Sequence, residues 1–264
     1  MDDGNTYQSP LYISLAIEAL ARCGDGWRPD AVTSVVMGFM ALEAFVNEVA
    51  GTAAVLAKQD EKISLWQRTK NGVGPQMTSE QLTELYEHVS GRTRDPDPPI
   101  TTTLAAVLVP ATKKRVPAEE RYDLILQCLG APAGFKGREP RQGMWCLAQA
   151  RHHMVHRKSD ETTMRLVGGS LTSEEWNLGT VHQDHPVPEF ARYLQNRNVL
   201  PAGTYPGPTS KDFMLILCRR EVAAWACQVA VNAAREVVKL LPDSELRRRI
   251  GRQTLLGSGH TAGL

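Results

Sequence analysis

The stretch AVTSVVMGFMALEAFVNEVAGTAAVLAKQ, residues 31–59, is apolar over most of the circumference of a helix. The apolar residues that carry this pattern are Val32, Val35, Val36, Phe39, Met40, Leu42, Ala44, Phe45, Val46 and Val49. A helix that is apolar on nearly every side must be surrounded by other elements, so this one is predicted to lie at the centre of a helical bundle. Glu43 and Asn47 interrupt it one turn apart on the same face. Burial of such groups is costly, so the pair requires a cation and a hydrogen-bond donor from elsewhere.

Helical spacing also occurs outside this stretch, whereas the two-residue alternation typical of strands is nearly absent. Before it, SPLYISLAIEALARCG (residues 9–24) predicts a helix of about four turns. Ser9 is its predicted N-cap, Pro10 occupies the first helical position, and Gly24 ends it.

After the central stretch, TSEQLTELYEHVSG (residues 78–91) and PAEERYDLILQCLG (residues 117–130) predict two weaker helices. Pro117 begins the second of them. Between the two, RTRDPDPPITTT (residues 92–103) is rich in proline and is predicted to be a loop. The basic runs in 111–117 and 245–252 are interpreted as solvated faces, with RNA contact as the alternative.

The second half of the chain contains two further helical stretches, residues 140–158 and residues 211–241. Between them, residues 159–209 lose the helical period and collect glycine and proline, which predicts a long irregular insertion. Residues 244–250 are predicted to form a short basic turn, and residues 251–264 a flexible tail. The fold class is therefore predicted to be all-α.

Composition is consistent with one soluble domain spanning residues 1–264. The chain is 42% hydrophobic and carries 30 basic against 29 acidic side chains, so attraction for nucleic acid would have to come from a local patch. The N-terminus resembles no signal sequence, and no apolar stretch reaches the length of about 18 residues that spans a bilayer. The five cysteines of the chain are scattered and predict neither a disulfide framework nor a zinc ribbon. A cytoplasmic protein without membrane contact is expected.

The segment ARHHMVHRKSD, residues 150–160, concentrates three of the seven histidines of the chain. His152 and His156 stand one turn apart, as two zinc ligands on a helix do, and VHQDH (residues 181–185) contains further ligand types. His153 occupies the position at which zinc proteases carry their glutamate base, so no metal is predicted. A second interpretation is structural, because cations at the C-terminal end of any helix interact favourably with its dipole.

The third interpretation of this segment is catalysis. Arg151 interrupts a stripe that otherwise holds Leu147, Ala148 and Val155, so its guanidinium is expected to point toward the core. A buried guanidinium requires an anion, and Glu43 is the candidate.

Arg151, four intervening residues and His156 match the Arg-x(4–6)-His signature, and this segment resembles that of HEPN domains (higher eukaryotes and prokaryotes nucleotide-binding). GFMALEAFVNEVAG resembles the first core helix of such proteins, and YDLILQCLG followed by GREPRQGMWCLAQARHHMVHRK resembles their approach to the signature. REVAAWACQVAVNAAREVVKLLP is similar to their closing helix. The resemblance covers about half the chain in the same order. His152 stands where the family most often has asparagine, and Lys158 where modified members have tyrosine.

The resemblance implies an all-helical, HEPN-like bundle with two long core helices that is a metal-independent endoribonuclease without a cofactor. It also implies a homodimer with a composite site, and a role as a toxin or antiviral effector with a possible antitoxin or regulatory protein as partner. The alternative is a non-catalytic HEPN-like module that binds a nucleotide, nucleic acid or a protein.

Roles for individual residues follow from the chemistry of RNA cleavage. A histidine near its ordinary pKa of about 6.5 can give or take a proton at neutral pH, and an arginine offers a permanent bidentate phosphate donor. His156 is the predicted proton-transfer residue and Arg151 the phosphate clamp. His152 is predicted to be a second donor or a positioning residue, and Glu43 to orient Arg151. The predicted substrate contacts are Asn47, Arg157 and Lys158.

Overall fold

The computed structural model describes residues 8–23, 29–89, 99–155, 189–200 and 217–253. Within these ranges the regular structure is helical, with no strand, so the predicted all-α class is confirmed. The elements are α1 (Ser9–Arg22), α2 (Pro29–Lys70), α3 (Ser79–Val89), α4 (Pro99–Lys113), α5 (Ala118–Cys128), the 3-10 turn η1 (Phe135–Gly137), α6 (Arg141–Val155), α7 (Glu189–Asn196), α9 (Arg220–Leu240) and α10 (Glu245–Gln253).

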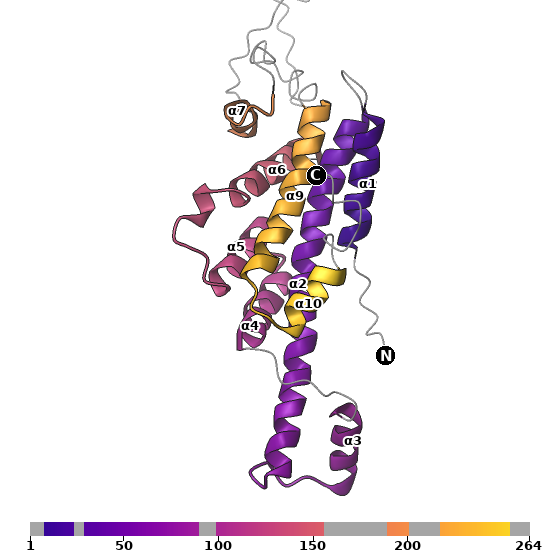
Figure 1. Ribbon diagram of the computed structural model, residues 1–264, viewed down its shortest axis with the longest axis vertical. Helices are drawn as coiled ribbons and strands as arrows, with labels where there is room; N and C mark the ends of the chain where they lie inside the picture. Colours follow the sequence, from indigo (N-terminus) through magenta and orange to yellow (C-terminus); the bar gives the residue numbers. More distant parts are fainter. Residues whose placement is uncertain (1–7, 24–28, 90–98, 156–188, 201–216, 254–264) are drawn as a thin grey trace, which may run out of the picture.

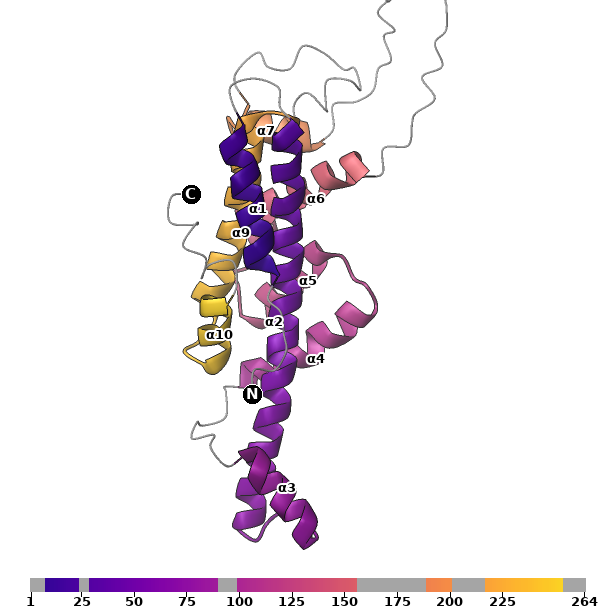
Figure 2. The ribbon, with the colours of Figure 1, turned by 90° about the vertical axis from the view of Figure 1, so that its right-hand side faces the viewer.

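The central position predicted for the apolar stretch is confirmed. Helix α2 is 42 residues long, and α1, α4, α5, α6, α9 and α10 pack around its first two thirds (Figures 1 and 2). Its core side chains include Val35, Leu42, Phe45, Val46 and Leu56, all 0% exposed. The helix is longer than predicted, and its last turns extend beyond the bundle to pair with α3 (Figure 1).

Small residues allow α2 and α9 to lie close together. A Cβ atom added at Gly38 would stand 3.3 Å from the carbonyl oxygen of Ala226, closer than most such contacts. Both residues are buried. The two long helices therefore form the central pair of the bundle, and the remaining helices cover it.

Helix α2 is long and apolar enough to cross a membrane by length and composition alone. The prediction that no stretch reaches this length is therefore wrong for α2. However, 56% of its most apolar 18-residue window is buried against the rest of the chain, and the core helix of a folded bundle passes the same test.

The N-terminus of α1 is capped differently from the prediction. Ser9 is the first helical residue rather than the N-cap, and Gln8 is the N-cap without a side-chain cap hydrogen bond. The cap comes from α2, where Glu48 Oε1 accepts hydrogen bonds from the backbone N–H groups of Gln8 (2.6 Å) and Ser9 (2.8 Å). The Ser9 hydroxyl donates to Glu48 Oε2. Burial raises the pKa of the Glu48 carboxyl, and the hydrogen bonds from Ser9 and Gln8 oppose that rise.

Glu48→Ala should destabilise the chain by about 1–2 kcal/mol, because it removes the acceptor from the first backbone N–H groups of α1. Equilibrium unfolding in urea would measure the loss. Glu48→Gln keeps an acceptor but cannot ionise, which makes it the matched control. Because the pKa of Glu48 is raised on folding, wild-type stability should fall as pH rises above the ordinary value of 4.5, and this fall should be absent in Glu48→Gln. Equal stability of Glu48→Ala and wild type would contradict the capping role.

Three predicted irregular segments contain helices. The loop predicted at 92–103 is wrong from Pro99 onward, because α4 begins there and buries Thr101, Leu104 and Leu108. Its threonines and the internal Pro110 disfavour a helix locally, and packing against α2 overrides that preference.

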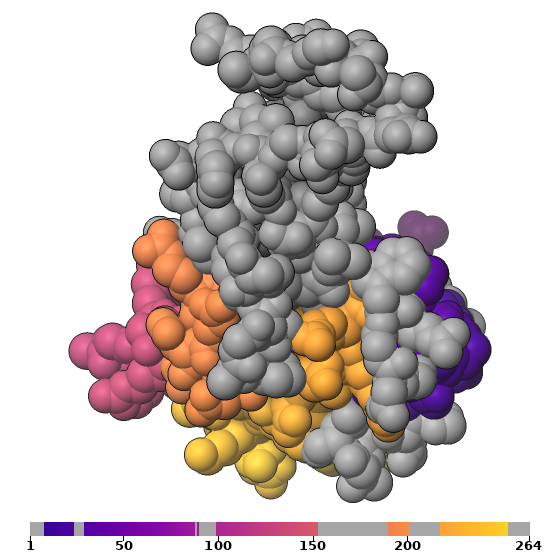
Figure 3. All heavy atoms as spheres, turned by 90° about the horizontal axis from the view of Figure 1, so that it is seen from above, coloured from indigo at the N-terminus to yellow at the C-terminus, as the bar shows by residue number. Residues whose placement is uncertain are grey.

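The insertion predicted at 159–209 contains α7, whose Phe190, Ala191 and Leu194 join the core. The prediction is therefore wrong for Glu189–Asn196, while residues 159–188 and 201–209 lie outside the described residues. In the view from above, α7 adjoins α6 at the upper edge of the bundle (Figure 3).

The two C-terminal boundaries also differ from prediction. The helix predicted at 211–241 is interrupted before Arg220, where α9 begins, because Arg219 is an N-cap with extended backbone; residues 211–216 lie outside the described residues. The predicted short basic turn is helix α10, which runs through residues 251–253 of the predicted tail, and Leu246 and Ile250 attach it to the core at 0% exposure.

Candidate functional site

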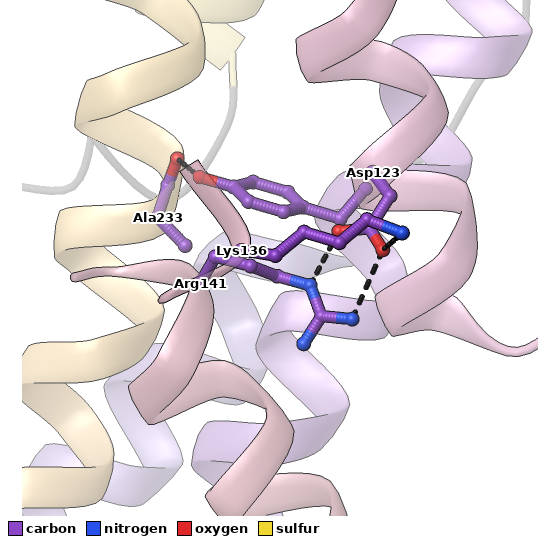
Figure 4. A network of polar contacts seen from close by, with 5 residues as sticks. Asp123, Lys136, Arg141 and Ala233 are labelled. Carbon is purple, nitrogen blue, oxygen red and sulfur yellow. Dashed lines mark hydrogen bonds and ion pairs between the residues drawn. The ribbon is translucent and has the colours of Figure 1, made fainter. Parts of the chain in front are cut away.

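Helix α6 carries the described part of the signature. It is held by apolar side chains in the core and by an ion pair at its first residue. Met144 and Leu147 are completely buried in the core, and Trp145 packs against it. At its first residue, Arg141 Nε and Nη2 both donate to the carboxylate of Asp123 on α5, the latter at 3.0 Å (Figure 4). Lys136 Nζ lies 3.3 Å from the same carboxylate. The start of α6 is thus tied to α5.

Arg151 stands near the described end of α6 and is half-buried. Its guanidinium carbon lies 5.5 Å from the centroid of the Phe39 ring on α2. Such a cation–π contact holds the guanidinium in place and leaves the donors at its edge available. The orientation toward the core is as the sequence predicts, but the partner is aromatic. The predicted ion pair between Arg151 and Glu43 is not among the contacts of the described residues.

Glu43 and Asn47 do receive the cation that the sequence requires, and it is Arg121 of α5. Arg121 Nη1 donates to Asn47 Oδ1 and lies 3.4 Å from the Thr112 hydroxyl. Burial lowers the pKa of Arg121, which is 5% exposed, and the charges of Glu43 and Glu119 raise it. The predicted substrate contact Asn47 therefore has a partner within the fold.

Arg121 was missed by the sequence interpretation, although a signal for it exists. It lies three residues after Ala118 and four before Ile125, both of which are buried, so it interrupts an apolar stripe as Arg151 does. Phe39, Glu43 and Asn47 follow one another at four-residue intervals on one face of α2. Arg151 meets this face at Phe39, and Arg121 meets it at Asn47.

The remaining predicted site residues lie near the end of α6 or outside the described residues. His152 is exposed at the end of α6. His156, Arg157 and Lys158 lie outside the described residues, as do the candidate metal ligands in 181–185. Within the described part of the chain, no three His, Cys, Asp or Glu side chains are placed to hold a metal ion.

Helix α7 docks on the first turn of α6 through a second polar cluster. Glu139 accepts hydrogen bonds from the Tyr193 hydroxyl and from the backbone N–H of Gly143 (3.1 Å), and Arg197 Nη2 lies 3.4 Å from it. Burial raises the pKa of Tyr193, and the hydrogen bond to Glu139 raises it further. The ring centroid of Trp225 on α9 lies 6.0 Å from that of Tyr193, so this tryptophan packs against α7.

No profile of a known protein family, no curated protein and no solved structure matches this chain. Its function is therefore inferred from its residues and their geometry.

Proposed function

We propose that this chain is a metal-independent endoribonuclease of the HEPN type that acts as a cytoplasmic homodimer. The observation that supports this proposal most is the position of Arg151 over the Phe39 ring, with no carboxylate partner among the described residues. A guanidinium neutralised by a carboxylate has few donors to offer a substrate. One held by an aromatic face keeps its planar, bidentate donor edge for a phosphate.

The proposed reaction is transesterification within the RNA backbone. The 2′-oxygen bonds to the adjacent phosphorus, the bond from phosphorus to the 5′-oxygen breaks, and the products end in a 2′,3′-cyclic phosphate and a 5′-hydroxyl. One group must take the 2′-hydroxyl proton and another must protonate the 5′-oxygen. His156 is proposed for proton transfer, with His152 as a second donor, while Arg151 stabilises the charge that grows on the phosphorane oxygens.

The spacing of the signature favours a composite site. Five residues along a helix correspond to about 140° of rotation, so two side chains at that spacing point in different directions. Helix α6 extends to Val155, which places His156 directly after it in the sequence. A two-fold dimer that brings two copies of α6 together would supply Arg151 and His156 from both subunits to one cleft.

Purified protein should cleave mixed cellular RNA in excess chelator, because no step in this reaction uses a metal ion. His156→Ala should reduce the rate about 100-fold or more, the ordinary contribution of a positioned proton-transfer group. Cleavage would be followed by gel electrophoresis and by detection of 2′,3′-cyclic phosphate ends.

A DNA strand of the same sequence is the matched control and should remain intact, since it lacks the 2′-hydroxyl. Circular dichroism must show that His156→Ala retains its helical content. Activity that disappears on chelation would reject the mechanism, and an absence of cleavage by wild-type protein would favour the non-catalytic binding module.

A further inference from the structure

The C-terminal hairpin of α9 and α10 presents a strongly basic outer face. Helix α10 is attached to the core by Leu246 and Ile250, which are four residues apart and 0% exposed. Its sequence ELRRRIGRQ contains four arginines and one carboxylate. Because the two apolar side chains occupy one side of the helix, the arginines are distributed over its remaining circumference.

The single carboxylate of α10 engages two of these arginines. Glu245 Oε1 lies 2.9 Å from Arg249 Nε, and Glu245 Oε2 lies 3.5 Å from Arg248 Nη2. The Arg248 side chain remains 57% exposed. Arg247 and Arg252 have no carboxylate partner among the described residues, and Arg252 is exposed. Positive charge on α10 is therefore only partly neutralised.

Helix α9, which precedes α10 in the chain and contacts it, carries an exposed polar line of its own. Gln228, Asn232, Arg235 and Lys239 recur at spacings of four, three and four residues and are all exposed. Over residues 228–253, six cations stand against the carboxylates of Glu236, Asp243 and Glu245, an excess of three. The formal charge of the whole chain is only +1, so the rest of the chain carries a net charge of −2 (+1 minus +3).

We propose that this face, residues 228–253 of α9 and α10, binds the phosphate backbone of RNA. Five of its six cations are arginines, whose planar guanidinium donates two hydrogen bonds to one phosphate. Gln228 and Asn232 add uncharged donors and acceptors of the kind that contact sugar and phosphate oxygens. The inference goes beyond the proposed cleavage site and does not depend on catalysis.

A membrane surface fits this face less well. A helix that lies in a bilayer interface buries its apolar side among the lipids. The two large apolar side chains of α10 are instead buried in the protein core. The exposed large hydrophobic residues of the described chain are Leu11 and Leu15 on α1, Val73, and Tyr86 on α3, none of which belongs to this hairpin.

The basic face is separate from the signature helix. In Figure 1, α10 lies lower along the bundle than α6, and in Figure 2 the two helices stand on opposite sides of α2. Loss of the basic face should therefore weaken RNA binding without changing the rate of cleavage of bound RNA.

The test measures binding of a fluorescent 2′-O-methyl oligouridylate of about 20 nucleotides, which cannot be cleaved, by anisotropy across a range of salt concentrations. Arg248 and Arg252 are both exposed and lie one turn apart on α10, so they share its outward side. Arg248→Gln with Arg252→Gln should weaken binding about tenfold and reduce the slope of log K against log salt by about 1.4, because two phosphate contacts are lost. Arg248→Lys with Arg252→Lys retains the charges and should keep most of the wild-type slope.

Arg68→Gln with Lys70→Gln is the matched control, because it removes the same charge from exposed residues at the end of α2, outside both basic runs. Its binding should equal that of wild type. The inference is overturned if wild type does not bind the oligonucleotide, if the control loses as much affinity as the α10 variant, or if the hairpin variants affect only binding to phosphatidylserine vesicles. If the α10 variant cleaves RNA and binds the oligonucleotide as tightly as wild type does, this inference alone is refuted. If wild-type protein binds the oligonucleotide but cleaves no RNA, only the proposed ribonuclease is refuted.

Discussion

Asp123→Ala is expected to lower the free energy of unfolding by about 3–5 kcal/mol, because it breaks a buried ion pair by removing one partner. The Asp123 side chain is 7% exposed and faces Arg141, which is 11% exposed, so removal of the carboxylate leaves a guanidinium buried without its anion. Lys136 loses the same partner (Figure 4). Because the total stability of a domain is about 5–15 kcal/mol, the variant should unfold at much lower urea concentration.

Asp30→Ala is the control for this prediction. Asp30 also pairs with an arginine, Arg22, but their side chains are 36% and 57% exposed. An exposed pair of this kind contributes about 0–1 kcal/mol. A double-mutant cycle between Asp123 and Arg141 would separate the pairing from the loss of each side chain. Equal destabilisation by Asp123→Ala and Asp30→Ala would show that α6 is not held by this carboxylate.

Arg151→Ala should lower kcat/KM for RNA about 1000-fold, an effect of the size seen when a charge-stabilising donor is removed from a transition state. Arg151→Lys keeps the charge but loses the planar pair of donors, so its activity should be intermediate. The measurement is single-turnover cleavage in excess chelator.

Phe39→Leu tests how Arg151 is positioned. It removes the aromatic face that lies 5.5 Å from the guanidinium and replaces it with an apolar side chain at a core position that is 7% exposed. A cation–π contact contributes about 0.5–2 kcal/mol, so the rate should fall by up to about 30-fold, well short of the loss in Arg151→Ala. If Arg151→Ala cleaves RNA at the wild-type rate, Arg151 is not the phosphate clamp of the proposed mechanism.

The polar residues of α2 show how far the sequence could define the candidate site. The sequence predicted that Glu43 and Asn47 would face a cation, because polar groups in an apolar helix are costly to bury without partners; in the structure Asn47 hydrogen-bonds Arg121 although it is exposed. The identity of that cation was not predictable, since Arg151 and Arg121 both interrupt apolar stripes and both reach the same face of α2. Which arginine lies beside Asn47 depends on the positions along α2 at which α5 and α6 cross it, and no local sequence pattern encodes those positions.

Short helices show the same limit for the fold. Helix α10 contains only two buried apolar residues among four arginines, so its local pattern indicates a solvated basic turn. Helix α7 follows a stretch rich in glycine and proline. Its Phe190 and Leu194 are buried only because the helix docks on the bundle. Such helices are too short to be stable alone, and tertiary packing stabilises them.

From its sequence alone, this protein could be assigned to the all-α class with α2 at its centre, because helical periodicity is local and a helix that is apolar on most sides must be covered by neighbours on most sides. Only the tertiary structure decided that Arg121 serves Asn47, that Arg151 rests on Phe39, and that α10 presents its arginines outward. Those outcomes depend on contacts between residues far apart in the chain, whose geometry is set when the helices pack together.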